Sequence, residues 1–152
     1  MSYLCELKEQ AAQPTLMVRA TTPVQELPRV LGQAYGAIAQ YLGQVGEQPA
    51  GPPFVLYHNM DMQALDIEVG FVVARHLPGK GEIQSGEIPA GKFASVLHTG
   101  PYDQCGSAYA ALTQFVQSSG HVATGASYEF YLNDPQQTPL QELQTLIMFL
   151  LK

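Results

Sequence analysis

The chain has 152 residues, of which 46% are hydrophobic and 13% are charged, and its formal net charge is −6 at pH 7. This length suits about one domain with a real core, and an acidic balance without any Lys/Arg cluster argues against nucleic acid as a direct partner. No apolar run is long enough to span a membrane and the charged N-terminus does not resemble a signal peptide, so we expect a soluble cytoplasmic protein.

After a polar opening, the first half of the chain predicts a strand, a helix and two strands. Residues 15–23 form a short strand closed by a proline, and residues 24–45 place apolar side chains at helical spacing. A Gly/Pro-rich linker at 46–53 leads to two further strands, at 54–59 and 65–73.

The second half of the chain repeats this pattern. Strands at 82–88 and 92–99 flank a Pro-Ala-Gly turn, and residues 102–119 form an amphipathic helix. A glycine-containing loop then leads to a strand at 127–132, and a last strand covers about 143–151.

The order strand, helix, strand, strand therefore occurs twice, which indicates a duplication of about 75 residues per copy. The copies cover approximately 15–73 and 82–151 of a single domain (1–152), and aligning their Asn residues makes Tyr57 and Tyr131 counterparts. We predict an α+β fold in which duplicated βαββ units form a largely antiparallel sheet with two helices on one face. A ligand cleft is expected at the pseudo-twofold axis.

One carboxylate, Glu129, lies in the strand-forming stretch YEFYLNDP (128–135), which ends in an Asn-Asp-Pro turn signal. Strand alternation places Glu129 and Tyr131 on one face and Tyr128 and Phe130 on the other. A solvated edge position is one interpretation. The alternative is a carboxylate among aromatic rings, which would have a raised pKa and would attract a cation.

Three passages together resemble a known family: IPAGKFASVLHTGPYDQCGSAYAALTQFV, YEFYLNDP, and the hairpin PFVLYHN … LDIEVGFVV. They are similar to the GyrI-like small-molecule-binding domain, the effector-binding domain of multidrug-sensing transcription regulators, which has an SHS2-type duplicated βαββ fold. The resemblance covers nearly the entire chain. It implies an aromatic cleft whose acidic residue attracts large, flat, often cationic molecules, and it places Glu129 at the ligand-facing glutamate.

The chain departs from the family pattern at several points. Leu146 occupies a position where the family often has a second glutamate, whereas Glu68, its counterpart in the first copy, is retained. No DNA-binding segment accompanies the domain, so a standalone form is expected. Because the chain has no Trp, tyrosines must supply the stacking surface. The candidates are Tyr57, Tyr102, Tyr109 and Tyr131.

The other candidate side chains have plainer alternatives. Glu68 is a candidate ligand residue, but its strand also reads as a half-solvated one. His98 is a candidate ligand residue and a hypothetical acid/base partner of Glu129, because both belong to strands of the second copy. Neither it nor His58 has a third ligand at a metal-like spacing, and Cys105 is typical of a buried helix residue. We expect no metal and no cofactor.

Three functions are compatible with these residues. The first is a standalone protein that binds hydrophobic, cationic or flat aromatic small molecules, without direct contact with nucleic acid or membrane. The second is a hydrolase of reactive electrophiles such as cyclopropane-containing compounds, in which Glu129, with Glu68, activates water. The third is a protein-interaction module like the gyrase inhibitor. Leu146 favours binding over hydrolysis, because it removes one family acid.

Overall fold

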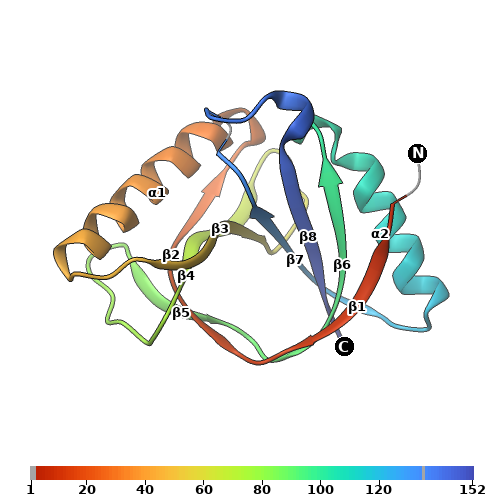
Figure 1. The fold of residues 1–152 in the computed structure, drawn as a ribbon, viewed down its shortest axis with the longest axis horizontal. Coiled ribbons are helices and arrows are strands. Elements are labelled where there is room, and N and C mark those ends of the chain that lie inside the picture. The colour runs from red at the N-terminus through yellow and green to blue at the C-terminus, as the bar shows by residue number, and fades with distance from the viewer. Residues whose placement is uncertain (1–2, 135) are drawn as a thin grey trace. The chain divides into compact units, whose positions relative to one another are not determined.

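The computed structural model describes residues 3–134 and 136–152, and within them the chain has an α+β fold of eight strands and two α-helices (Figure 1). Met1, Ser2 and Pro135, the last residue of the YEFYLNDP motif, lie outside the described residues. The chain divides into two compact units. One covers Ala11–Ala90, and the other joins Gly91–Lys152 to the residues up to Gln10. Among the described residues no helix is long and apolar enough to cross a membrane.

The Ala11–Ala90 unit contains one helix and four strands in the order β3-β4-β2-β5. Its α-helix packs the buried residues Ile38 and Leu42 against Leu16 and Val73 of the strands. The helix ends before Gly46, whose φ of 72° is the left-handed conformation that closes many helices. The elements are β2 (Gln13–Thr22), the 3-10 turn η1 (Val24–Glu26), α1 (Leu27–Gln44), β3 (Pro49–Tyr57), β4 (Leu65–Val73) and β5 (Gln84–Ile88).

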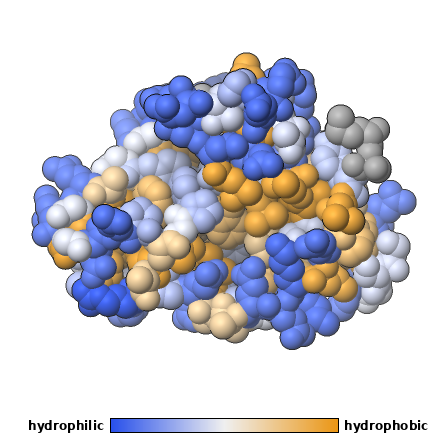
Figure 2. Space-filling model, in the orientation of Figure 1, coloured by the Kyte–Doolittle hydropathy of each residue, from blue (hydrophilic) through white to orange (hydrophobic). Residues whose placement is uncertain are grey.

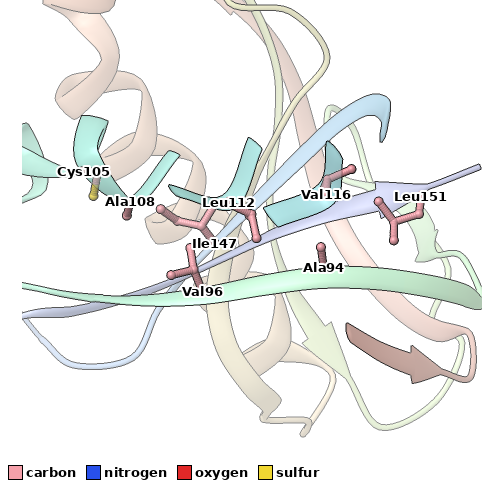
Figure 3. Close-up of a cluster of buried hydrophobic side chains, with 8 residues drawn as sticks. All are labelled: Ala94, Val96, Cys105, Ala108, Leu112, Val116, Ile147 and Leu151. Atoms are coloured by element: carbon pink, nitrogen blue, oxygen red, sulfur yellow. The ribbon is translucent and has the colours of Figure 1, made fainter. Parts of the chain in front are cut away.

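The second unit has the same plan, with strands in the order β1-β6-β8-β7. Its core lies between the helix and the sheet, where Leu112 packs with Val96 and Ile147 (Figure 3). These three side chains are at most 1% exposed. The elements are β1 (Cys5–Gln10), β6 (Gly91–Thr99), η2 (Tyr102–Gln104), α2 (Gly106–Ser118), β7 (Ala123–Tyr131), η3 (Leu140–Glu142) and β8 (Gln144–Leu151).

Strand register and turn contacts identify equivalent residues in the two units. The side-chain oxygen of Asn59 accepts a hydrogen bond from the backbone N–H of Asp66 at 3.0 Å, and that of Asn133 accepts one from the N–H of Gln144 at 2.9 Å. Each Asn also donates to a carbonyl of its own loop. The strand register thus places Tyr57 and Tyr131, two residues before each Asn, at equivalent positions of the two units.

Three predicted segments differ from the structure. The polar opening contains a strand, β1, which pairs with β6 some ninety positions later in the sequence, a partner that local pattern does not reveal. Strand β3 begins at Pro49, inside the predicted linker, with a register shift before Pro53. The strand predicted at 82–88 for the second copy is β5, which pairs with β2 of the first unit. Ile83, just before it, packs in the cluster under α1 and holds the segment there.

Truncation of Leu112 tests the packing of α2. Leu112→Ala should lower the free energy of unfolding by about 2–5 kcal/mol, because it removes a fully buried side chain and leaves a cavity. Urea denaturation would measure this loss. Gln114→Ala, at an exposed position of the same helix, is the control and should change stability by less than about 0.5 kcal/mol. Equal losses in the two variants would contradict the assignment of the buried face.

Candidate functional site

The Glu129 carboxylate is held between two tyrosine hydroxyls. Strand β7 places Glu129 on the side of the sheet that α2 covers, since its register partner Ile147 belongs to the cluster under that helix. Tyr131, two residues along β7, donates a hydrogen bond to Oε1 at 2.8 Å. Tyr109, from α2, donates a hydrogen bond to Oε2. Each carboxylate oxygen therefore accepts one hydrogen bond from a phenol hydroxyl.

Further side chains hold the two phenols in position. The Ser127 hydroxyl donates to the Tyr109 oxygen at 3.3 Å, and the Tyr109 ring lies 5.9 Å from the ring of Phe149. The Tyr131 ring meets the Tyr102 ring edge-on, with centroids 5.3 Å apart and an interplanar angle of 62°. Such tilted arrangements are favourable for aromatic pairs. Tyr102, in the 3-10 turn η2, is 37% exposed.

The charge of this carboxylate is not matched by a cationic side chain. Burial raises the pKa of Glu129, and the hydrogen bonds from Tyr109 and Tyr131 oppose that rise. Among the described residues no Lys, Arg or His forms an ion pair with it. A half-buried carboxylate is costly without a positive partner, even where neutral donors reduce the penalty.

Two polar side chains lie beside this group, deeper in the second unit. Thr145 of β8 is the register partner of Tyr131 and is fully buried. Cys105, immediately before α2, is buried in the cluster under the helix. Burial and, to a smaller extent, the nearby Glu129 charge raise the pKa of the Cys105 thiol to about 11, so it stays protonated at neutral pH. Such a thiol is a poor nucleophile.

His98, a predicted ligand residue, has both ring nitrogens engaged elsewhere. It is 3% exposed, its Nε2 lies 3.1 Å from the carbonyl of Pro101, and its Nδ1 lies 3.3 Å from the hydroxyl of Tyr3. In this arrangement Nε2 can donate to the Pro101 carbonyl and Nδ1 can accept from the Tyr3 hydroxyl. No contact in the described structure links His98 to Glu129 as an acid/base pair.

The remaining predicted site residues belong to the Ala11–Ala90 unit. Tyr57 is 7% exposed and pairs with Ile67, on the side of the sheet that α1 covers. Glu68, one residue further along β4, points to the opposite side by strand alternation. Its carboxylate lies 2.6 Å from Nε2 of His58. Glu68 and Tyr57 therefore occupy different faces of their strands.

Leu146, which stands where the family often has a second glutamate, lies on the side of its strand that faces away from α2. Leu146 pairs with Phe130 and Leu97, and alternation directs all three away from α2. Leu97 is 41% exposed. Figure 2 shows hydrophobic residues reaching the surface in a broad patch over β6 and β8. The side of the sheet that carries Glu129 is unaffected by this departure.

At equivalent positions the two units have similar aromatic pairs but different polar residues. Tyr35 of α1 packs on Phe71 at 5.4 Å, as Tyr109 of α2 packs on Phe149. Register then matches four polar residues of the second unit with apolar residues of the first. Glu129, Thr145, His98 and Ser127 correspond to Val55, Ile67, Ala20 and Pro53. The second unit alone has polar groups at these positions on its helix-covered face.

The family follows from comparison with known proteins. The model of the GyrI-like small molecule binding domain matches residues 5–152. The chain belongs to the GyrI-like family. The resemblance inferred from its motifs is confirmed. A comparison with curated protein sequences finds no match to this GyrI-like domain.

Solved structures of EcmrR are similar to this GyrI-like domain. The crystal structure of the EcmrR C-terminal domain is 26% identical with a TM-score of 0.84, and the match covers 100% of this chain and 99% of that one. EcmrR in its complex with DNA is 26% identical with a TM-score of 0.85, over 99% of this chain. The match covers 57% of that chain, so the GyrI-like domain spans little more than half of its length.

Two more distant structures share the fold alone. A hydrolase from Listeria innocua is 14% identical with a TM-score of 0.70, and the match covers 97% of this chain and 91% of that one. SAV2435, whose structure contains tetraphenylphosphonium, is 10% identical with a TM-score of 0.69, over 100% of this chain and 94% of that one.

The structure thus brings together four of the predicted residues, Glu129, Tyr131, Tyr109 and Tyr102, in one unit. Sequence reasoning missed Ser127 and Thr145. Ser127 precedes Glu129 by two residues, so alternation could have found it, whereas Thr145 reaches the site only through the pairing of β7 with β8. In the described part of the chain no group of three or more His, Cys, Asp or Glu side chains could hold a metal ion.

The raised pKa of Glu129 makes a prediction about stability and pH. The folded protein holds the carboxyl proton more tightly than the unfolded chain, so this group's contribution is fully present below the ordinary glutamate pKa of about 4.3. It is lost as the pH rises through the folded value. The stability of wild type relative to Glu129→Gln should therefore fall over this range. Urea denaturation of both proteins from acid to neutral pH measures this change. If wild type instead gained stability relative to Glu129→Gln as the pH rose, the result would contradict the burial of Glu129.

Proposed function

We propose that this GyrI-like domain binds hydrophobic, cationic small molecules, with the positive charge next to the Glu129 carboxylate. The observation that carries the proposal is the half-buried carboxylate, which two phenols hold and which has no ion pair with a cationic side chain among the described residues. A bound cation would supply the missing charge, and its attraction is strengthened where water is partly excluded.

The surrounding rings support the same class of ligand. Tyr109, Tyr131, Tyr102 and Phe149 present aromatic surface around one charge, and ring faces attract cations. The hydrogen bonds that Tyr109 and Tyr131 donate to Glu129 fix the two rings around the carboxylate. A large, flat or multi-ring cation could then lie against aromatic carbon while its charge is near the carboxylate.

The relatives are consistent with this proposal. SAV2435 was solved with tetraphenylphosphonium, a donor-free aromatic cation. EcmrR was solved in complex with DNA, and its C-terminal domain is the part that the GyrI-like domain matches. A role for this chain in sensing a small molecule on behalf of a DNA-binding protein follows as a proposal from that likeness.

The hydrolytic alternative draws less support from this geometry. A general base needs a free carboxylate lone pair directed at the attacking water. Each Glu129 oxygen accepts one phenol hydrogen bond, which occupies one of its two lone pairs, stabilises the charged form and so weakens the carboxylate as a base. The second predicted acid, Glu68, is hydrogen-bonded to His58 on the other side of its own strand.

A charge-matched pair of probes tests the proposal. Tetraphenylphosphonium should bind wild type, and Glu129→Gln, which keeps the shape and removes the charge, should weaken binding by about ten- to a hundredfold. Tetraphenylborate, of nearly the same shape and opposite charge, should bind wild type poorly and gain from the substitution. Isothermal titration calorimetry measures both, and analysis for ligand breakdown products tests hydrolysis in the same samples.

Glu68→Gln is the matched control, because it removes another strand carboxylate with a hydrogen-bonded partner. Its affinity for tetraphenylphosphonium should equal that of wild type. Loss of affinity in Glu68→Gln, or unchanged affinity in a folded Glu129→Gln, would overturn the assignment of the charge to Glu129. Conversion of the ligand would favour the hydrolase.

A further inference from the structure

Thr145 presents a buried hydroxyl beside the Glu129 site for which the protein supplies no good partner. The residue is 0% exposed, and among the described residues its Oγ1 makes no hydrogen bond of normal geometry. The Cys105 thiol is close enough to Thr145 for the hydroxyl to oppose the rise of the thiol pKa. Sulfur is a weak acceptor, so this contact satisfies the hydroxyl poorly.

An unpaired buried hydroxyl is unusual and lowers stability, because the group loses its hydrogen bonds to water without replacement. Valine has nearly the same shape without this penalty. The first unit has an apolar residue, Ile67, at the equivalent position, which is equally buried. The fold therefore does not require a hydroxyl at this point of the strand.

Position connects this hydroxyl with the charged group. Thr145 is the register partner of Tyr131, and Glu129 is the register partner of Ile147, so Thr145 and Glu129 are diagonal neighbours on one face. Diagonal neighbours on paired strands have Cα atoms about 7–8 Å apart, which is within the reach of one small ligand. Both residues are polar where the first unit is apolar, at Ile67 and Val55.

We propose that the Thr145 hydroxyl is a second ligand-binding group of this site, which donates a hydrogen bond to an oxygen of the bound cation. The ligand class would then be an amphipathic cation that carries a hydroxyl, ether or carbonyl oxygen near its charged centre, as in an amino alcohol. This inference rests on the proposed binding of a cation at Glu129 and adds a determinant of specificity to it.

The entry of such a ligand requires a local rearrangement. The Tyr102 ring packs on the ring of Tyr131, whose strand partner is Thr145. Tyr102 belongs to a short 3-10 turn without a side-chain cap and is 37% exposed. In the proposed complex, the Tyr102 side chain rotates away from Tyr131 and gives the ligand access to the hydroxyl.

Two ligands that differ in one group test the inference. Benzyldimethyl(2-hydroxyethyl)ammonium and benzyldimethylpropylammonium have the same charge and nearly the same shape, and only the first has a hydroxyl. Wild type should bind the hydroxyl ligand about two- to tenfold more tightly, the net effect of one neutral hydrogen bond. Thr145→Val and Thr145→Ala should reduce that ratio to about one, while Thr145→Ser should keep it.

Calorimetric titration of each variant, with thermal melting to confirm folding, separates the outcomes. Equal affinities in wild type, both weakened by Glu129→Gln, would overturn the role of Thr145 and leave the cation site intact. A hydroxyl preference that survives in Thr145→Val would also overturn it, because the group would then bind elsewhere. If neither ligand binds wild type, the cation proposal fails and this inference fails with it.

Discussion

The hydrogen bonds that hold the Glu129 carboxylate between two phenols are the constraint on which the second unit's site depends. Removing a carboxylate from water is expensive, and neutral donors recover only part of that free energy. One donor comes from β7 itself and the other from α2, so the same charge fixes the position of the helix relative to the strand. Ser127 adds a hydrogen bond to Tyr109 and extends this constraint along the strand. A ligand that changes the charge at Glu129 would therefore act directly on α2.

The duplication provides an internal comparison that separates folding from binding. In the first unit Tyr35 of α1, which packs on Phe71 as Tyr109 packs on Phe149, donates a hydrogen bond to the backbone carbonyl of Phe54. The position equivalent to Glu129 is the fully buried Val55. The same helix, strand register and tyrosine–phenylalanine pair therefore form without a carboxylate. Buried polar and charged groups such as these often stabilise a fold less than well-packed apolar residues of similar volume. Residues that break a local rule in this way are expected at functional sites.

Much of this could be predicted from local pattern, because the signals concerned are local. Alternation along 128–132 placed Glu129 and Tyr131 on one face, and the apolar period of 24–45 and 102–119 predicted both helices. Local pattern does not predict which strands pair when they are far apart in the sequence. The pairings of β1 with β6, of β5 with β2, and of Thr145 with Tyr131 are set by long-range register. The predicted cleft between the copies stays a prediction.

The position of Leu146 bears on how many charges the helix-covered side of the second unit can hold. Because Leu146 and Glu129 are separated by one residue in register, they point to opposite faces of the sheet. A glutamate at 146 would lie among Phe130 and Leu97, away from the phenols. Its absence leaves the charge next to the phenols unchanged, and its first-unit counterpart Glu68 is hydrogen-bonded to His58 on that same far side. Among the described residues of β6, β7, β8 and α2, Glu129 is the one carboxylate on the helix-covered face of the second unit. A single positive centre neutralises it, and a second charge on a ligand would need to reach solvent.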